Sequence, residues 1–265
     1  MADTAQHQTL GRPPAAGGGE APARGGGRGL SGPQVSRTSP VSAGYAKTRS
    51  RVETYFDRTA TKTWERLTSD APVSGIRATV RAGRDAMRAL ILNQLPDDLT
   101  GTRILDAGCG TGALAFELAE RGADVMGIDI SPQLVGIAQK RTPLHLQGKL
   151  TFRAGDMLDP AHGSFDHIVA MDSLIYYTAQ DIGDILTGLA PRLAENMIFT
   201  VAPRTPLLML MWRVGKLFPQ SDRSPTMIPH SIGDLAFALP SPVRLREIER
   251  ITSGFYISSA LEFRP

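Results

Sequence analysis

Residues 103–112 read Arg-Ile-Leu-Asp-Ala-Gly-Cys-Gly-Thr-Gly, and this stretch decides the fold class. Its first half is a short apolar run of the kind that forms a buried strand, and its second half has a glycine at every second position. Glycine lets the chain turn sharply and brings backbone N–H groups close to a ligand, which a side chain would block. The stretch therefore predicts a strand, a ligand-binding turn and the start of a helix.

The alternation of strand and helix continues along the chain. Four further apolar runs alternate with helical patterns, at residues 123–129, 149–155, 165–172 and 196–202. This order predicts a parallel sheet with right-handed crossovers and helices on both faces. Residues 243–251 and 254–264 follow each other after a short link, which predicts an antiparallel hairpin. A mostly parallel seven-stranded sheet that ends in such a hairpin is the outline of the Rossmann-like class I methyltransferase fold.

The N-terminal region divides by composition. Residues 1–47 are rich in Gly, Pro and Arg and hold almost no large apolar side chain, so we expect a disordered basic tail. Over residues 48–95, apolar residues recur at helical spacing, which predicts N-terminal helices that part near Pro72. We therefore expect one methyltransferase domain at residues 48–265, with an apolar, lid-like insertion at residues 203–240.

The distribution of charge bears on the class of partner. The formal net charge is +3, but residues 1–51 carry seven Lys or Arg and two Asp or Glu, so the remainder carries −2. A slightly acidic body argues against nucleic acid, which requires a basic face. The single cysteine excludes a disulfide framework, and no His or Cys spacing indicates a metal site. Because no apolar stretch could span a bilayer, we expect a cytoplasmic protein or one docked on a membrane surface.

Two cofactors could use the glycine-rich turn. Gly108, Gly110 and Ala113 match the G-x-G-x-x-G/A pattern of dinucleotide sites, and Asp129 ends the second strand, where a ribose-binding acid belongs. Asp106 favours S-adenosylmethionine instead. A carboxylate inside the turn can bind the ammonium group of that cofactor, whereas a pyrophosphate has no positive group for it to bind. A nicotinamide-dependent reductase is the alternative enzyme class.

An acid also ends the third strand, where Asp156 could accept a hydrogen bond from an adenine amino group. Each acid has an ordinary structural explanation, since Asp129 could cap a helix and Asp156 could stabilise a turn. Three such coincidences at the carboxyl ends of successive strands favour a ligand crevice. The residues expected to bind the cofactor are Tyr55, Asp106, Gly108, Cys109, Gly110, Gly112, Asp129, Ile130, Asp156, Met157 and Met171.

Four longer segments carry a family resemblance, at residues 55–88, 105–131, 170–177 and 199–225. They resemble the magnesium-protoporphyrin IX O-methyltransferases of bacteriochlorophyll synthesis, and the resemblance covers nearly everything after residue 50. It implies transfer of a methyl group from S-adenosylmethionine to the ring-C propionate of magnesium-protoporphyrin IX, giving the monomethyl ester. It also implies contact with the porphyrin-carrying subunit of magnesium chelatase, and a cytoplasmic location with at most peripheral attachment to the inner or photosynthetic membrane.

The chemistry implied by the resemblance depends on positioning. A propionate is ionised at neutral pH and needs no general base, so the enzyme must align the reactants and exclude water. Tyr176 and Tyr177 follow the fourth strand, and we expect one of them to face the reacting centre. The plant and cyanobacterial branch has His at the position of Tyr176, so no acid/base role is carried over to it. The residues expected at the macrocycle are Phe56, Trp64, Arg204, Met209, Trp212 and Arg223.

Other functions stay open from the residues alone. A methyltransferase could act on another small apolar substrate, and a porphyrin carrier would bind the macrocycle without turnover. An RNA methyltransferase is disfavoured, because Asp172-Ser173-Leu174 stands after the fourth strand where a base-methylating Asn-Pro-Pro-aromatic motif would be expected.

Overall fold

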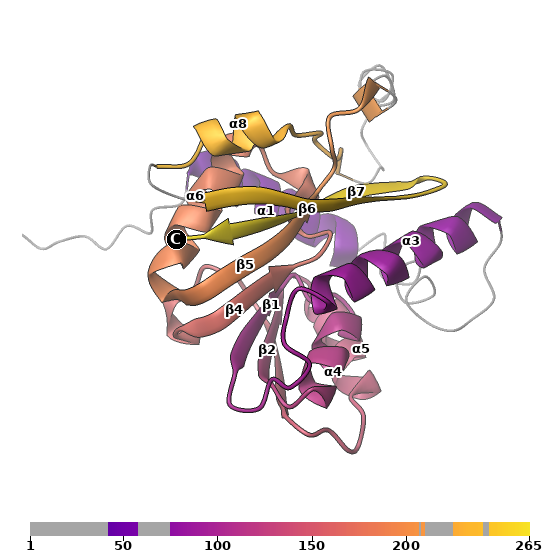
Figure 1. The fold of residues 1–265 in the computed structure, drawn as a ribbon, viewed down its shortest axis with the longest axis vertical. Coiled ribbons are helices and arrows are strands. Elements are labelled where there is room, and N and C mark those ends of the chain that lie inside the picture. Colours follow the sequence, from indigo (N-terminus) through magenta and orange to yellow (C-terminus); the bar gives the residue numbers. More distant parts are fainter. Residues whose placement is uncertain (1–41, 58–74, 207, 210–224, 241–243) are drawn as a thin grey trace, which may run out of the picture. The chain divides into compact units, whose positions relative to one another are not determined.

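The computed structural model describes residues 42–57, 75–206, 208–209, 225–240 and 244–265 (Figure 1). These residues form a seven-stranded sheet with the order β3-β2-β1-β4-β5-β7-β6. Its strands are β1 (Arg103–Ala107), β2 (Asp124–Asp129), β3 (Lys149–Ala154), β4 (Phe165–Ala170), β5 (Leu193–Val201), β6 (Arg244–Ser253) and β7 (Tyr256–Arg264). Strands β1 to β5 are parallel, and β7 is antiparallel to β5 and β6. The predicted parallel sheet with a C-terminal hairpin is therefore confirmed.

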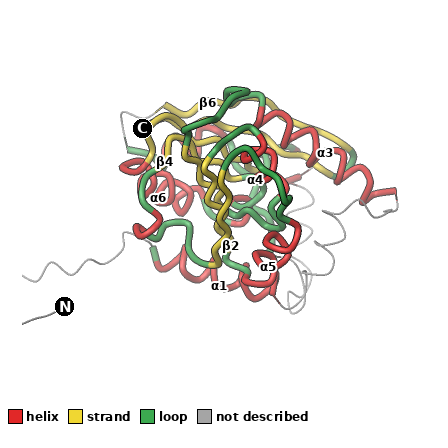
Figure 2. Tube along the Cα trace, turned by 90° about the horizontal axis from the view of Figure 1, so that it is seen from below, coloured by secondary structure: helices red, strands yellow, loops and turns green. Residues whose placement is uncertain are grey.

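Helices cover both faces of the sheet (Figures 1 and 2). They are α1 (Ala43–Tyr55), α3 (Gly75–Leu92), α4 (Ala113–Glu120), α5 (Pro132–Arg141), α6 (Ala179–Leu189) and α8 (Ile232–Phe237), with 3₁₀ turns η2 (Pro160–His162), η3 (Leu174–Tyr176) and η4 (Ala190–Arg192). None of the described helices is long and apolar enough to cross a membrane.

The two faces follow from the period of two along each strand. In β1, Leu105 and Ala107 face the cluster that contains α1 and α6, whereas Ile104 faces the cluster that contains α3, α4 and α5. In β5, Phe199 packs with the first cluster and Ile198 with the second. Such strands, buried on both faces, read as continuous apolar runs in the sequence.

The order of the strands positions the site. Strand β1 lies between β2 and β4, so the chain leaves it toward β2 on one side and returns later on the other. In parallel sheets this reversal opens a crevice at the carboxyl ends of the central strands. The glycine-rich turn follows β1 directly and therefore lies at that crevice.

The start of the first helix corrects the predicted boundary of the tail. Helix α1 begins at Ala43, and the side chain of Ser42 accepts a hydrogen bond from the backbone N–H of Tyr45. Tyr45 is 1% exposed. The expected disorder was wrong for residues 43–47, because the buried Tyr45 side chain anchors this part of α1. Residues 1–41 and the expected boundary at Pro72 lie outside the described residues.

Parts of the expected insertion are anchored to the domain. The described residues 225–240 lead back to the sheet and are called the return segment. A parallel bridge between Pro203 and His230 joins this segment to the chain just after β5. The backbone N–H of Ile228 donates to the carbonyl of Ile175 at 2.8 Å, and a ring nitrogen of His230 lies 2.9 Å from the carbonyl oxygen of Tyr177. The return segment is thus attached to the turn that follows β4.

Candidate active site

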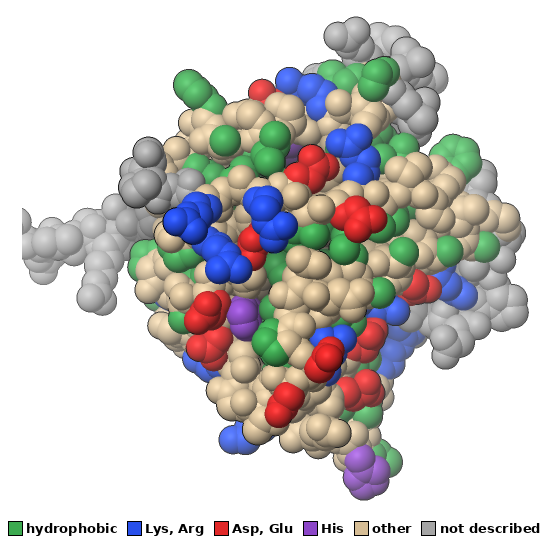
Figure 3. Space-filling view, viewed as in Figure 1, with side chains coloured by type: hydrophobic (Ala, Val, Ile, Leu, Met, Phe, Trp, Pro, Cys, Tyr) green, Lys and Arg blue, Asp and Glu red, His purple; other side chains and the backbone are tan. Residues whose placement is uncertain are grey.

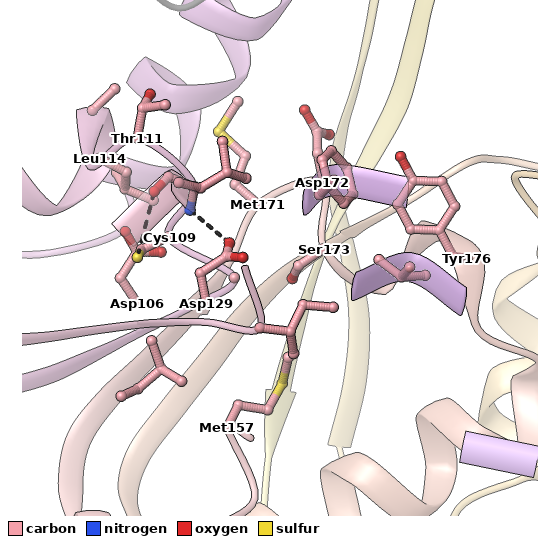
Figure 4. A pocket seen from close by; sticks show the side chains of 18 of the residues that line it. Asp106, Cys109, Thr111, Leu114, Asp129, Met157, Met171, Asp172, Ser173 and Tyr176 are labelled. Atoms are coloured by element: carbon pink, nitrogen blue, oxygen red, sulfur yellow. Dashed lines mark hydrogen bonds between the residues drawn. The ribbon is translucent and has the colours of Figure 1, made fainter. Parts of the chain in front are cut away.

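A pocket lies at the carboxyl ends of β1, β2 and β4 (Figure 4). The empty space within its outline, open solvent included, is about 970 Å³. The structure brings many of the predicted site residues into its wall: Phe56, Asp106, Gly108, Cys109, Gly110, Asp129, Ile130, Met157, Met171, Tyr176 and Tyr177.

The turn after β1 needs glycine for two different reasons. Gly108 has a φ of +84°, and a Cβ there would lie 2.3 Å from the Cβ of Ser173. Gly110 has a φ of +54°, and a Cβ there would meet nothing within 4 Å. The first glycine permits close packing against the chain after β4, and the second leaves open space beside the backbone. A ligand can therefore approach the backbone at Gly110.

Asp129 fixes the shape of this turn. Its two carboxylate oxygens accept hydrogen bonds from the backbone N–H groups of Gly110 and Ser131, each at 2.9 Å. The side chain is buried, which raises its pKa to about 6 even though both N–H groups favour the ionised form. Each oxygen retains a second lone pair, so a ribose hydroxyl could also bind there.

Asp106 lies at the bottom of the same turn and is 2% exposed. Its Oδ2 atom has no hydrogen-bond partner among the described residues. Burial, and then the negative charge of Asp129, raise its pKa to about 7. A buried carboxylate oxygen without a partner is costly unless a ligand supplies a donor or a cation. The ammonium group of S-adenosylmethionine fits this requirement.

Cys109 and Gly112 have structural positions within the turn. Burial raises the pKa of the Cys109 thiol, so it is not an activated nucleophile. Gly112 is not in the pocket wall; it precedes α4 with a φ of +90°, and its absent side chain leaves room for Phe116 and Phe152.

Asp156, at the end of the third strand, contacts two side chains of α1. Its Oδ1 atom accepts from the Tyr45 hydroxyl at 2.6 Å, and its Oδ2 lies 2.6 Å from the Arg49 guanidinium. Both partners come from α1, and the carboxylate does not belong to the pocket wall, although its neighbour Met157 does. Asp156 thus forms a clasp between α1 and the end of β3, and its contact with adenine stays a prediction.

The tyrosines after β4 both border the pocket. Tyr177 also stacks on Tyr45, with ring centroids 5.2 Å apart, and Tyr176 meets Phe56 edge-on at 6.3 Å. Burial raises the pKa of Tyr177, so its hydroxyl stays neutral at physiological pH. Tyr55 is not in the wall and packs edge-on against Phe56.

The residues expected at the macrocycle are placed only in part. Arg204 lies 3.0 Å from Asp234 and, like the half-buried Met209, is not among the pocket residues. Trp64, Trp212 and Arg223 lie outside the described residues. In the described part of the chain, no three His, Cys, Asp or Glu side chains gather as a metal site would require.

Sequence reasoning missed an ion pair in the pocket wall. The Arg84 guanidinium of α3 lies 2.6 Å from the carboxylate of Asp172. Asp172 is the second residue after the end of β4, and both residues belong to the pocket wall. The end of a parallel strand is a signal that could have identified Asp172, because such ends meet at the crevice. No local pattern marks Arg84, since α3 reaches the pocket only through tertiary packing.

Comparisons with known proteins agree with this geometry. The family described as "Magnesium-protoporphyrin IX methyltransferase C-terminus" matches residues 170–265, and a general methyltransferase domain matches residues 104–196. The magnesium-protoporphyrin O-methyltransferase of Rhodobacter capsulatus is 58% identical over 222 residues, which cover 83% of this chain and 98% of that protein. The chain belongs to this methyltransferase family.

Solved structures of the family have the same fold. The crystal structure of magnesium protoporphyrin IX methyltransferase from Synechocystis PCC 6803 with bound SAH superimposes with a TM-score of 0.70 at 28% identity. The match covers 82% of this chain and 100% of that one. The chloroplastic family member of Arabidopsis thaliana is 29% identical, over 81% of this chain and 70% of its own length.

Proposed function

We propose that this chain transfers a methyl group from S-adenosylmethionine to the ring-C propionate of magnesium-protoporphyrin IX. The product is the monomethyl ester of (bacterio)chlorophyll synthesis. The observation that carries the proposal is the 58% identity to the Rhodobacter capsulatus protein, over 83% of this chain and 98% of that protein.

The residues around the turn account for the cofactor. When bound, S-adenosylmethionine supplies an electrophilic methyl group on a sulfonium. Asp106 offers the ammonium group an ionic partner, and Asp129 offers the ribose hydroxyls an acceptor. The backbone at Gly110 leaves room for the cofactor chain to lie against it.

The other wall aligns the acceptor. The reacting carboxylate is ionised at neutral pH, so no side chain has to remove a proton. Phe56 and Met171 present apolar surface, and Tyr176 and Tyr177 border the same space. These groups exclude water from the carboxylate nucleophile and hold it in line with the methyl carbon. Catalysis by this wall is therefore a matter of orientation.

Partners and location extend the proposal. We assign the insertion at residues 203–240 a role as a lid over the macrocycle, since its return segment is bonded to the turn that carries the tyrosines. The porphyrin-carrying subunit of magnesium chelatase would deliver the substrate in the cytoplasm, with at most peripheral membrane contact. Acidic and basic side chains are interspersed on the face in Figure 3, unlike the basic surface that nucleic acid requires.

The test is incubation of the full chain with methyl-labelled S-adenosylmethionine and magnesium-protoporphyrin IX. Mass spectrometry should find one added methyl group, on the ring-C propionate. Porphyrin binding without methylation would favour the carrier, and binding of NAD(P) in place of S-adenosylmethionine would favour the reductase. Methylation of another small apolar acceptor with no transfer to the porphyrin would overturn the substrate while keeping the reaction class.

A further inference from the structure

Two arginines of α3, Arg84 and Arg88, belong to the pocket wall. They are four residues apart and therefore lie on the same side of the helix. The acids in the wall are Asp106, Asp129 and Asp172, so the wall carries more carboxylates than guanidiniums. Arg84 and Arg88 are the cationic side chains of this wall, so an anionic ligand group is stabilised by charge next to one of them.

The two arginines have different partners. Arg88 contacts Asp85 at 3.0 Å and also pairs with Glu117; these acids are 52% and 41% exposed and do not belong to the pocket wall. Arg84 pairs with Asp172, whose side chain is 8% exposed and is part of the wall. Arg88 is thus directed toward surface acids, whereas Arg84 is held at the pocket.

The partner of Arg84 is itself held from several sides. Asp172 has a φ of +56° and is the one non-glycine residue with positive φ in the described ranges. Its backbone N–H donates to the Thr200 hydroxyl at 2.7 Å, and its Oδ1 accepts from the Tyr256 hydroxyl at 3.0 Å. A strained backbone persists when its surroundings fix it, and such positions cluster at functional sites. The carboxylate that orients Arg84 is therefore in place before any ligand arrives.

The methionine end of S-adenosylmethionine carries an ammonium and a carboxylate on the same carbon. If the ammonium lies at Asp106, the carboxylate must lie nearby in the same pocket. A guanidinium has five N–H donors in a planar fork, so a contact with Asp172 is compatible with a second carboxylate. We propose that Arg84, oriented by Asp172, binds the α-carboxylate of the cofactor, and this assignment rests on the proposed function.

Decarboxylated S-adenosylmethionine isolates this contact, because it keeps the sulfonium, the ammonium and the nucleoside. Calorimetry on the wild-type chain should show that S-adenosylmethionine binds about 10- to 100-fold more tightly than its decarboxylated form. In Arg84→Gln the ratio of the two dissociation constants should fall to near one, through loss of affinity for S-adenosylmethionine alone. Arg84→Lys keeps the charge without the fork, and should show an intermediate ratio.

Three variants serve as controls. Asp106→Asn should weaken both ligands alike, because both retain the ammonium, and Arg77→Gln, at an exposed position of α3, should change neither. Arg88→Gln should preserve the ratio. Equal weakening of both ligands by Arg84→Gln, or loss of the ratio in Arg88→Gln instead, would overturn the proposal. A preserved contrast in a chain that fails to methylate the porphyrin would refute the substrate and leave this contact standing.

Discussion

The two walls of the pocket are built in different ways. In the wall formed by the turn after β1, Gly110 and Asp129 are 19 residues apart along the chain. The second wall contains Arg84 and Asp172, which are 88 residues apart, and the clasp outside the pocket joins Tyr45 to Asp156 across 111 residues. The first wall follows from local backbone geometry, whereas the second exists only when distant helices pack correctly. Damage to helix docking should therefore affect the second wall first.

Truncation of the N-terminus should give the largest effect. Removing residues 1–47 deletes Tyr45, which is 1% exposed, stacks on Tyr177 and bonds to Asp156. Loss of such a buried aromatic should lower the unfolding free energy by about 3–5 kcal/mol. Removing only residues 1–41 should change it by less than about 0.5 kcal/mol. Denaturant titration of both truncated chains measures the difference, and equal stabilities would contradict the assignment of α1 to the folded domain.

A smaller variant separates the hydroxyl from the ring. Tyr45→Phe keeps the stack on Tyr177 and removes only the donor to Asp156, so it should cost about 1–2 kcal/mol. A cost as large as that of the long truncation would place the stabilisation in the hydrogen bond.

The turn after β1 should be broken most strongly at Gly108. An alanine there combines left-handed strain with a contact of 2.3 Å to Ser173, and should destabilise the protein by about 2–4 kcal/mol. Gly110→Ala has similar backbone strain but open space, so it should cost about 1 kcal/mol. Thermal unfolding of both variants gives the comparison. Equal costs would mean that the close approach to Ser173 does not matter.

The difference between the walls also explains what the sequence reveals. The five parallel strands and the hairpin were predictable, because buried strands read as apolar runs and their order limits the topology. The position of Asp106 and Asp129 in the pocket wall was predictable because they stand near the carboxyl ends of β1 and β2. Arg84 was not, because nothing in the local pattern of α3 shows which part of it reaches the pocket. The contacts of Asp156 with Tyr45 and Arg49 were not predicted, because the two partners lay in a segment thought to lack packing contacts or at its edge.

Acidification should lower the affinity for S-adenosylmethionine by roughly a factor of ten per pH unit for each acid that must be ionised, below the pKa of that acid. Burial raises the pKa of Asp106 to about 7 and that of Asp129 to about 6. The protonated acids cannot pair with the ammonium or bind hydroxyls as carboxylates, so affinity for S-adenosylmethionine should fall as the pH drops from 8 to 5.5. Calorimetry over this range tests the slope, which Asp106→Asn should reduce. An unchanged affinity in the wild-type chain would remove both acids from the binding site.

The stability of the ligand-free chain should respond in the opposite sense. Both folded pKa values lie above the ordinary value of 3.8, so the folded state binds more protons than the unfolded state between about pH 4 and 7. The contribution of these two acids to stability is therefore present at low pH and is lost as the pH rises through 6 and 7. The melting temperature of Asp106→Asn, compared with wild type across this range, isolates the part due to Asp106.

The smallest effect is expected at the insertion, where neighbouring residues distinguish a lid from core. Met209 is half-buried, whereas Leu208 is 9% exposed. If Met209 faces the macrocycle, Met209→Ala should leave the unfolding free energy within about 1 kcal/mol and still raise the dissociation constant of magnesium-protoporphyrin IX. Leu208→Ala should instead cost about 2–4 kcal/mol and leave porphyrin affinity unchanged where the protein stays folded. Fluorescence titration with the porphyrin and denaturant titration supply both quantities for each variant. If Met209→Ala lowers stability without changing affinity, the segment is core, and the macrocycle must then lie against Phe56 and the two tyrosines after β4.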